Sequence, residues 1–219
     1  MSKWIIRMTV AITAVALLMS MTACGSSSPS AVTLSDEDLV ALMKQVAESD
    51  VADSYGDYLR DEAFADAEVF GIDKDGELYS AYAYLFEGEY VVLKDKAYMM
   101  SGSSGEAIIR YTYGDDGITL SEVVWSADGG DHEKWLKKNF PAKYLKKARS
   151  YEAHDADGKN ILGLKLDETA GIALGVPVET DNLLEIDTEK GAYRIIRTID
   201  GEDGRFDTEI IETGKIGDL

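Results

Sequence analysis

The stretch AIIRYTY, residues 107–113, decides the fold class. Ile109, Tyr111 and Tyr113 fall on one face of an extended chain, and the residues between them fall on the other. Successive side chains of a strand point to opposite faces, so this alternation predicts a strand with one buried face. Such strands are typical of antiparallel sheets.

Further strand candidates lie on both sides of this stretch, separated by turn signals such as Asp75-Gly76, Glu87-Gly88 and Asp115-Asp116-Gly117. Short strands joined by short turns predict an antiparallel meander. The residues between the two glycines of Gly102-Ser103-Ser104-Gly105 suggest a flexible loop. The predicted strands of the meander are 77–86, 89–93, 97–100, 107–113 and 118–125, and three more are predicted at 183–187, 192–199 and 206–212.

Two helical segments are predicted beside these strands. Ser35 followed by Asp38 is a capping-box pattern, and apolar residues at helical spacing follow it. We expect one helix with a break, or two short helices, through about residue 66. Asp131 can cap a second segment, in which Pro141 predicts a kink or two short helices. Residues 162–166 suggest a short strand, and residues 167–175 suggest a helical turn closed by Gly175.

The order of these elements predicts an α+β fold. We expect a curved antiparallel sheet, made of the meander plus the C-terminal strands, with the two helical segments packed against one face. Residues 34–219 are long enough for a single globular domain with a core of ordinary size.

The N-terminus carries a targeting signal. Lys3 and Arg7 precede an uncharged apolar run over residues 8–23, which has the length of a signal peptide. The run ends in Met21-Thr22-Ala23-Cys24, and this segment resembles the lipobox of bacterial lipoproteins, although Met21 stands where Leu is usual. The resemblance implies that residues 1–23 are removed and that Cys24 receives acyl chains such as palmitate.

The anchor would hold the protein on the extracytoplasmic face of the cell membrane, because two acyl chains suffice for stable anchoring. Residues 24–33, with Gly-Ser-Ser-Ser-Pro-Ser after Cys24, would form a flexible tether. The alternative is an ordinary signal peptide cleaved near Ala23. Cys24 is the only cysteine, so no disulfide can form within the chain.

The charge is strongly acidic and unevenly distributed. The full chain carries −19, and loss of the two positive charges of the signal segment would leave −21. A protein this acidic repels nucleic acid, which we exclude as a partner. Residues 134–149 nevertheless contain seven basic residues and no acidic one: Lys134, Lys137, Lys138, Lys143, Lys146, Lys147 and Arg149.

Aromatic and aliphatic residues recur at helical spacing within this basic segment, so it is amphipathic. One interpretation is contact with an anionic surface, such as lipid headgroups, an envelope polymer or an acidic partner. The other is internal: residues 35–68 carry eleven acids and two bases, and the two helical segments could lie side by side with the apolar stripe facing the core.

Twelve tyrosines suit a binding cleft, because each offers apolar contact and a hydroxyl. The candidates for such a cleft are Tyr82, Tyr84, Tyr111 and Tyr113, with Tyr79 beside them; plain cross-strand packing is the alternative.

Catalytic and metal motifs are absent from the sequence. It has two histidines, no G-x-S-x-G, no Walker loop, no G-x-G-x-x-G and no H-E-x-x-H. Four Asp-rich segments are typical of Asp-Gly turns and lack the glycine at position six of a calcium-binding EF-hand loop.

We therefore expect a non-enzymatic ligand- or partner-binding domain at the cell envelope, without cofactor or metal. The alternative is a hydrolase of wall polymer or glycan that uses two carboxylates, which 41 acidic residues leave unassigned.

Overall fold

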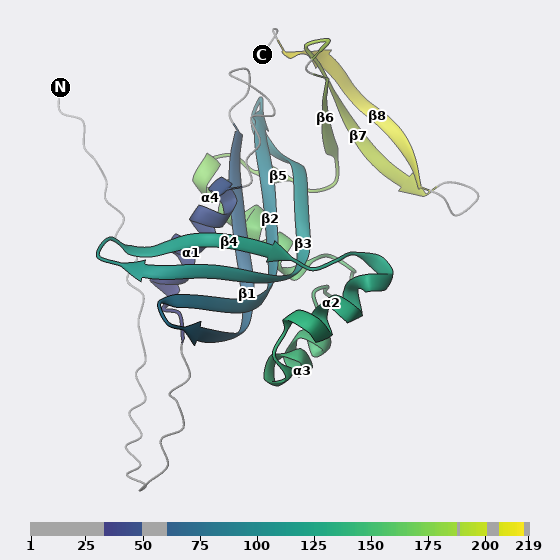
Figure 1. The fold of residues 1–219 in the computed structure, drawn as a ribbon. Coiled ribbons are helices and arrows are strands. Elements are labelled where there is room, and N and C mark those ends of the chain that lie inside the picture. The colour runs from purple at the N-terminus through teal and green to yellow at the C-terminus, as the bar shows by residue number, and fades with distance from the viewer. Residues whose placement is uncertain (1–32, 50–60, 188, 201–205, 217–219) are drawn as a thin grey trace, which may run out of the picture. The chain divides into compact units, whose positions relative to one another are not determined.

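A four-stranded antiparallel meander forms the centre of the molecule, in the order β1-β2-β3-β4 (Figure 1). The structure is a computed structural model that describes residues 33–49, 61–187, 189–200 and 206–216. The strands are β1 Asp61–Asp75, β2 Leu78–Leu93, β3 Lys96–Gly114 and β4 Gly117–Trp125, and the short β5, Val178–Glu179, pairs in parallel with β3. The α+β class and the meander are confirmed.

The two central strands are longer than the sequence predicts. Glu87-Gly88 lies inside β2 and residues 102–105 lie inside β3, where turns were expected. The physical reason is that Gly88 pairs directly with Gly102. Side chains of Leu166 and Met99 occupy the space beside Gly88, so the glycines allow close packing and do not end the strands.

The C-terminal strands form a second antiparallel sheet and do not extend the meander. This sheet has the order β6-β7-β8, with β6 Leu183–Asp187, β7 Ala192–Asp200 and β8 Phe206–Lys215. Its Leu184, Tyr193 and Ile195 pack against Val91 and Leu93 of β2. The two sheets therefore share an apolar cluster although no strand joins them through backbone pairing among the described residues.

Helices cover both faces of the meander, and not one face as predicted. On one face, which we call the α1 face, Ala83 and Leu85 pack with Leu42 and Val46 of α1. On the opposite face, which we call the α4 face, Tyr82 packs with α2 and α3, and Tyr90 packs with α4. The helices are α1 Asp36–Ser49, α2 His132–Asn139, α3 Ala142–Ser150 and α4 Ile161–Leu174, and a 3₁₀ turn, Gly129–Asp131, precedes α2.

Helix α1 begins where the capping pattern places it, because Ser35 Oγ accepts the Asp38 N–H at 3.1 Å. Gln45 of α1 bonds twice to β4, donating to the Ile118 carbonyl at 3.0 Å and accepting the Leu120 N–H at 2.8 Å. The prediction of helix up to residue 66 is wrong from residue 61 onward, where β1 runs; the rest of that prediction, residues 50–60, lies outside the described residues.

Two further predictions concern the second half of the chain. Pro141 separates α2 from α3, so the prediction of two short helices is confirmed. The predicted strand over residues 162–166 is wrong, because these residues form the start of α4. Gly175, with φ 73°, ends α4 in the left-handed conformation, as the helical turn predicted there requires.

Candidate functional site

An apolar groove runs along the outer edge of β1, between α1 and α4. Its volume is about 620 Å³, within the range of about 300–1,000 Å³ that is usual for ligand pockets. We call it the edge groove. Its apolar lining is Leu39, Val40, Met43 and Ala47 of α1, Ala63, Phe64 and Ala65 of β1, and Leu166 of α4. Its polar lining is Lys44, Glu48, Glu62, Asp66 and Thr169.

The groove lies at a free strand edge. β1 pairs with β2 on one side and with no other strand that the structure describes. Helix α1 lies on one face of the sheet and α4 on the other, so the two helices form the walls and β1 forms the floor. A sheet edge carries unpaired backbone donors and acceptors, which makes it a template for another strand.

Two hydrogen bonds show which residues of β1 turn their backbone groups outward. Ala67 N–H donates to the Asp66 carboxylate at 2.8 Å, and the Val69 carbonyl accepts from Lys147 Nζ at 2.9 Å. In an antiparallel strand the N–H and C=O of one residue point to the same side, and the side alternates along the chain. Ala63 and Ala65 therefore also present their N–H and C=O groups to the groove.

The other half of the β1 edge is covered by α3. Lys147 holds the Val69 carbonyl, and the Tyr144 hydroxyl donates to the Ile72 carbonyl at 2.9 Å. The ring of Tyr144 lies directly over Gly71, where any side chain would overlap it. A register shift between Val69 and Gly71 changes which residues face outward. The outward carbonyl before the shift is therefore that of Val69, and the one after it is that of Ile72. The sequence therefore protects this half of the edge with specific side chains.

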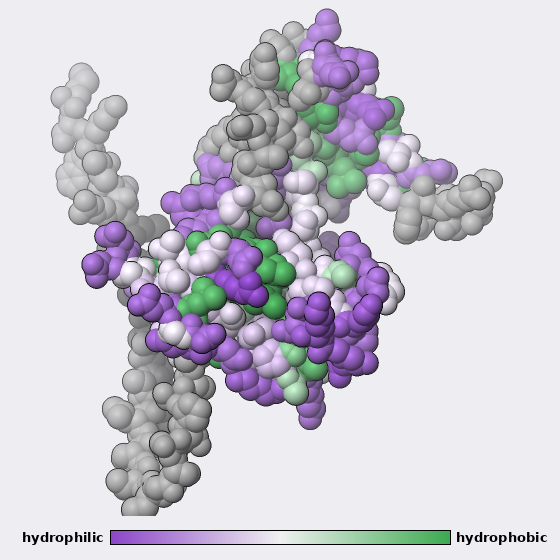
Figure 2. Space-filling model, in the orientation of Figure 1, coloured by the Kyte–Doolittle hydropathy of each residue, from purple (hydrophilic) through white to green (hydrophobic). Residues whose placement is uncertain are grey.

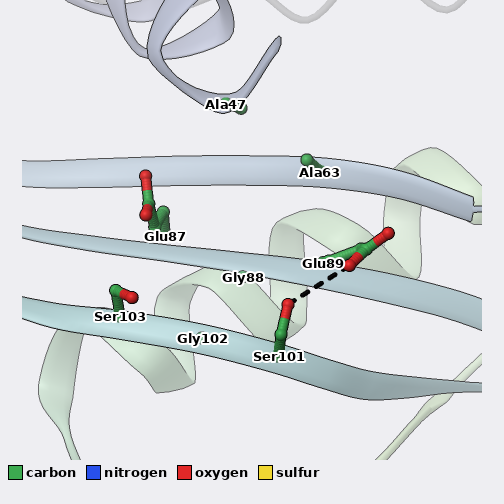
Figure 3. A pocket seen from close by; sticks show the side chains of 8 residues that line it. All are labelled: Ala47, Ala63, Glu87, Gly88, Glu89, Ser101, Gly102 and Ser103. Carbon is green, nitrogen blue, oxygen red and sulfur yellow. Dashed lines mark hydrogen bonds between the residues drawn. The ribbon is translucent and has the colours of Figure 1, made fainter. Parts of the chain in front are cut away.

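A row of acids and serines crosses the α1 face beside the groove (Figure 3). Glu87 of β2 pairs with Ser103 of β3, and Glu89 pairs with Ser101, whose hydroxyl lies 3.2 Å from the Glu89 carboxylate. We call these four residues the acid–serine row. They line a hollow of about 140 Å³ that shares Ala47 and Ala63 with the edge groove. Carboxylate and hydroxyl oxygens accept hydrogen bonds, so the row suits cationic or hydroxyl groups.

The four tyrosines predicted for a cleft lie on opposite faces of the sheet. Tyr82 and Tyr84 pack on the α4 face against rings of α3 and Tyr151. Tyr111 is fully buried and stacks on Tyr79 at 5.2 Å on the α1 face. Tyr113 is 42% exposed, and its hydroxyl donates to Asp38 at 3.0 Å. The structure thus places them in two packing clusters, and none of them lines the edge groove.

Four of the seven basic residues of α2 and α3 form internal ion pairs. Lys143 pairs with Asp73 at 2.5 Å and Lys147 with Glu68 at 3.0 Å, both on β1. Lys137 and Arg149 pair with Glu133, which holds the pKa of that carboxyl below its usual range. Lys134, Lys138 and Lys146 are exposed and form no ion pair with any described residue.

The apolar stripe of this basic segment faces the core, since Leu136, Phe140 and Ala148 are buried against the α4 face. The expected neighbour was the acidic helix at the N-terminus, but α1 lies on the opposite face of the meander. The compensating acids come instead from β1 and from Glu133.

Other chemistry is sparse in the part of the chain that the structure describes. No group of three or more His, Cys, Asp or Glu there could hold a metal ion, and no helix there is long and apolar enough to cross a membrane. His132 Nε2 lies 2.8 Å from the Glu106 carboxylate, away from the groove. Tyr90, fully buried, donates to Asp167 at 2.8 Å, and burial raises the pKa of both groups.

Comparison with protein-family models, with curated proteins and with solved structures gives no match.

The sequence did not predict the residues of the edge groove as a binding site. The signal was present in Ala63, Ala65 and Ala67, which alternate with larger or charged residues over the start of β1. Alanine and glutamate favour a helix by intrinsic propensity, and that preference masked the strand period.

Proposed function

We propose that this chain is a lipid-anchored extracytoplasmic protein whose folded part binds a ligand in the edge groove. The observation that carries the proposal is the groove itself: an apolar space of about 620 Å³ whose floor is a free strand edge. Concave apolar sites with a few polar groups are the usual form of a ligand site. The lipobox at Cys24 supports the anchor and the cell-envelope location.

Apolar residues are exposed at the groove and also at other places on the surface. Figure 2 shows a face on which hydrophilic residues dominate, with one group of apolar residues in its middle and others along the C-terminal strands. Val40, on the groove wall, is 70% exposed and would be covered by a ligand bound in the groove.

The geometry supports the hydrolase alternative less well. Glu87 and Glu89 do line one hollow, as two catalytic carboxylates would. The hollow, at about 140 Å³, is smaller than the usual ligand pocket, and the Glu89 carboxylate is bonded to Ser101.

Native mass spectrometry of the full-length protein, taken from its membrane in mild detergent, tests the proposal. We expect the mass of a chain that begins at a diacylated Cys24, together with a defined extra mass for the ligand. A Cys24→Ser variant should lose the lipid mass and leave the membrane fraction.

Two double variants of matched charge locate the ligand. Val40→Lys with Thr169→Lys places charges on both walls of the groove, whereas Ala41→Lys with Ala173→Lys places them at exposed positions of the same helices outside it. The extra mass should be lost from the first variant and kept by the second. A bare chain in all samples, or the same extra mass on both variants, would contradict binding in the groove.

A further inference from the structure

We propose that the ligand of the edge groove is an extended polypeptide segment, which adds to β1 as a further strand by pairing with Ala63 and Ala65. The inference rests on the proposed function, since it names the ligand class of the same site. Addition of a strand to a free sheet edge is a general mode of peptide recognition, in which the backbone supplies affinity and alternate side chains supply specificity.

The backbone argument comes from the contrast between the two halves of the β1 edge. Side chains of Asp66, Tyr144 and Lys147 occupy the outward groups from Ala67 to Ile72. The outward groups of Ala63 and Ala65 instead face an apolar groove. Polar backbone groups in an apolar site are costly to leave unpaired, and an incoming strand would pair with them.

The size of the open edge sets the length of the pairing. Residues 62–66 line the groove, and a strand advances about 3.3 Å per residue, so the paired segment is about five residues long. Helices α1 and α4 stand on the two faces of the sheet, so successive side chains of the segment would contact α1 and α4 in turn.

On the α1 face the incoming strand meets the apolar residues of α1, the short side chains of Ala63 and Ala65, and beyond these alanines the acids of β2. Ala63 pairs with Glu89, and Ala65 pairs with Glu87, so each alanine lies between the free edge and one carboxylate of the acid–serine row. Two strand spacings amount to about 10 Å, which a lysine and a glutamate span together. The lysine stem would pack across the alanines while its ammonium group reaches the acids.

On the α4 face the wall is apolar. Phe64 and Leu166 line it, and they belong to the same cluster as the fully buried Tyr90. Charged residues near the groove are mainly acidic, with Glu48, Glu62 and Asp66 against Lys44. The fitting segment therefore alternates basic residues toward α1 with apolar residues toward α4.

The test uses a fluorescein-labelled octapeptide of alternating lysine and valine, titrated with the full-length protein in detergent micelles and followed by fluorescence anisotropy. We expect saturable binding, and none for the same peptide with glutamate in place of lysine.

Ala65→Pro should weaken binding at least about tenfold, because it removes one outward N–H. Proline is tolerated at an edge position of this kind, and a thermal melt checks the fold. Ala65→Ser keeps the N–H and should bind as the wild type does.

A second measurement does not depend on the variants. N-methylation of alternate residues of the peptide removes the pairing donors in one register and leaves them in the other, so only one of the two methylated peptides should bind. Equal binding of both, equal binding by Ala65→Pro and Ala65→Ser, or no saturation below about 1 mM overturns the inference. If the protein forms a dimer that the peptide cannot dissociate, the inference is overturned too, because a second copy of the chain would then occupy the edge.

The outcomes separate the two proposals. If Val40→Lys with Thr169→Lys removes a natural ligand that is not a polypeptide, the groove remains a binding site and only the strand-addition inference falls. If that variant changes neither the natural ligand nor the peptide titration, both proposals fall.

Discussion

Gly71 shows how one residue fixes the position of a whole helix. A Cβ atom built on Gly71 would overlap the ring of Tyr144. The same tyrosine donates to Ile72 and Asp73 and contacts Tyr82. The absence of a side chain at Gly71 is therefore what lets α3 reach the backbone of β1 and cover its edge.

Gly71→Ala should reduce the free energy of unfolding by about 1–3 kcal/mol, the usual cost of overpacking a well-packed site. Urea unfolding followed by circular dichroism measures the change. Gly114→Ala is the matched control, because a Cβ there meets nothing within 4 Å. If both variants lost the same free energy of unfolding, the ring of Tyr144 would move away from the new Cβ atom without cost, which would contradict this account.

At the same scale, the sequence identified the tyrosines but not their surroundings. The prediction that Tyr111 and Tyr113 share one face of their strand is confirmed. Residue spacing gives the face of a strand, but it does not say whether that face is covered. Because helices cover both faces here, rings expected to line one cleft belong to two packing clusters.

Helix α4 is the element that its local sequence represents least well. Leu162, Leu164 and Leu166 alternate with other residues, which indicates a strand. The helix begins instead because the Asn160 side chain accepts the N–H groups of Leu162 at 3.0 Å and Gly163 at 3.1 Å. Burial of one apolar face then stabilises the helix, although Leu164 is left exposed. Asn before an apolar run was the available sequence signal.

Asn160→Ala should therefore reduce the free energy of unfolding by about 1 kcal/mol, the typical cost of losing an N-cap. It also removes the bond from Asn160 Nδ2 to the Tyr84 hydroxyl. Asn160→Asp keeps an acceptor for both N–H groups and should retain most of the stability. Chemical denaturation curves of the two variants, measured in parallel, give the two free energies of unfolding. If Asn160→Asp lost as much stability as Asn160→Ala, the capping role of Asn160 would be contradicted.

Strand β1 was missed for a different reason. Its first residues, Asp61 to Ala67, are acids, alanines and one phenylalanine, and most of these favour helix as single residues. Pairing with β2 over the whole length of β1 overrides that local preference. Since β1 forms the floor of the edge groove, the site could not be assembled from sequence even though the α+β class and the meander could.

At the scale of the whole molecule, many tyrosines have raised pKa values. Burial raises the pKa of Tyr90 and Tyr111, and burial together with the Asp38 carboxylate raises that of Tyr113 to about 12. A folded-state pKa above the unfolded value of about 10 means that the unfolded chain loses its protons first. The stability from these groups is present below pH 10 and falls as the pH rises through the folded-state values.

We expect the melting temperature to fall steadily above pH 10, with the loss of structure and the appearance of tyrosinate absorbance occurring together. Thermal melts between pH 8 and pH 12, with absorbance near 295 nm in the folded state, measure both. Tyr111→Phe should make the fall shallower, since its buried hydroxyl has no hydrogen-bond partner among the described residues and its loss costs little. Free titration of all tyrosines at pH 10 without unfolding would contradict this account.

The bonds from Gln45 to β4 have a consequence for the order in which the molecule forms. The hairpins of the meander join neighbours in the chain and close over short loops, which makes them fast. Helix α1 comes first in the chain, yet its polar contacts with Ile118 and Leu120 lie 73 and 75 residues further on. Helix α1 can pack on β1 and β2 before β4 is present, through Leu42 and Val46, but the two bonds that fix it to the far side of the meander form only once the fourth strand is in place.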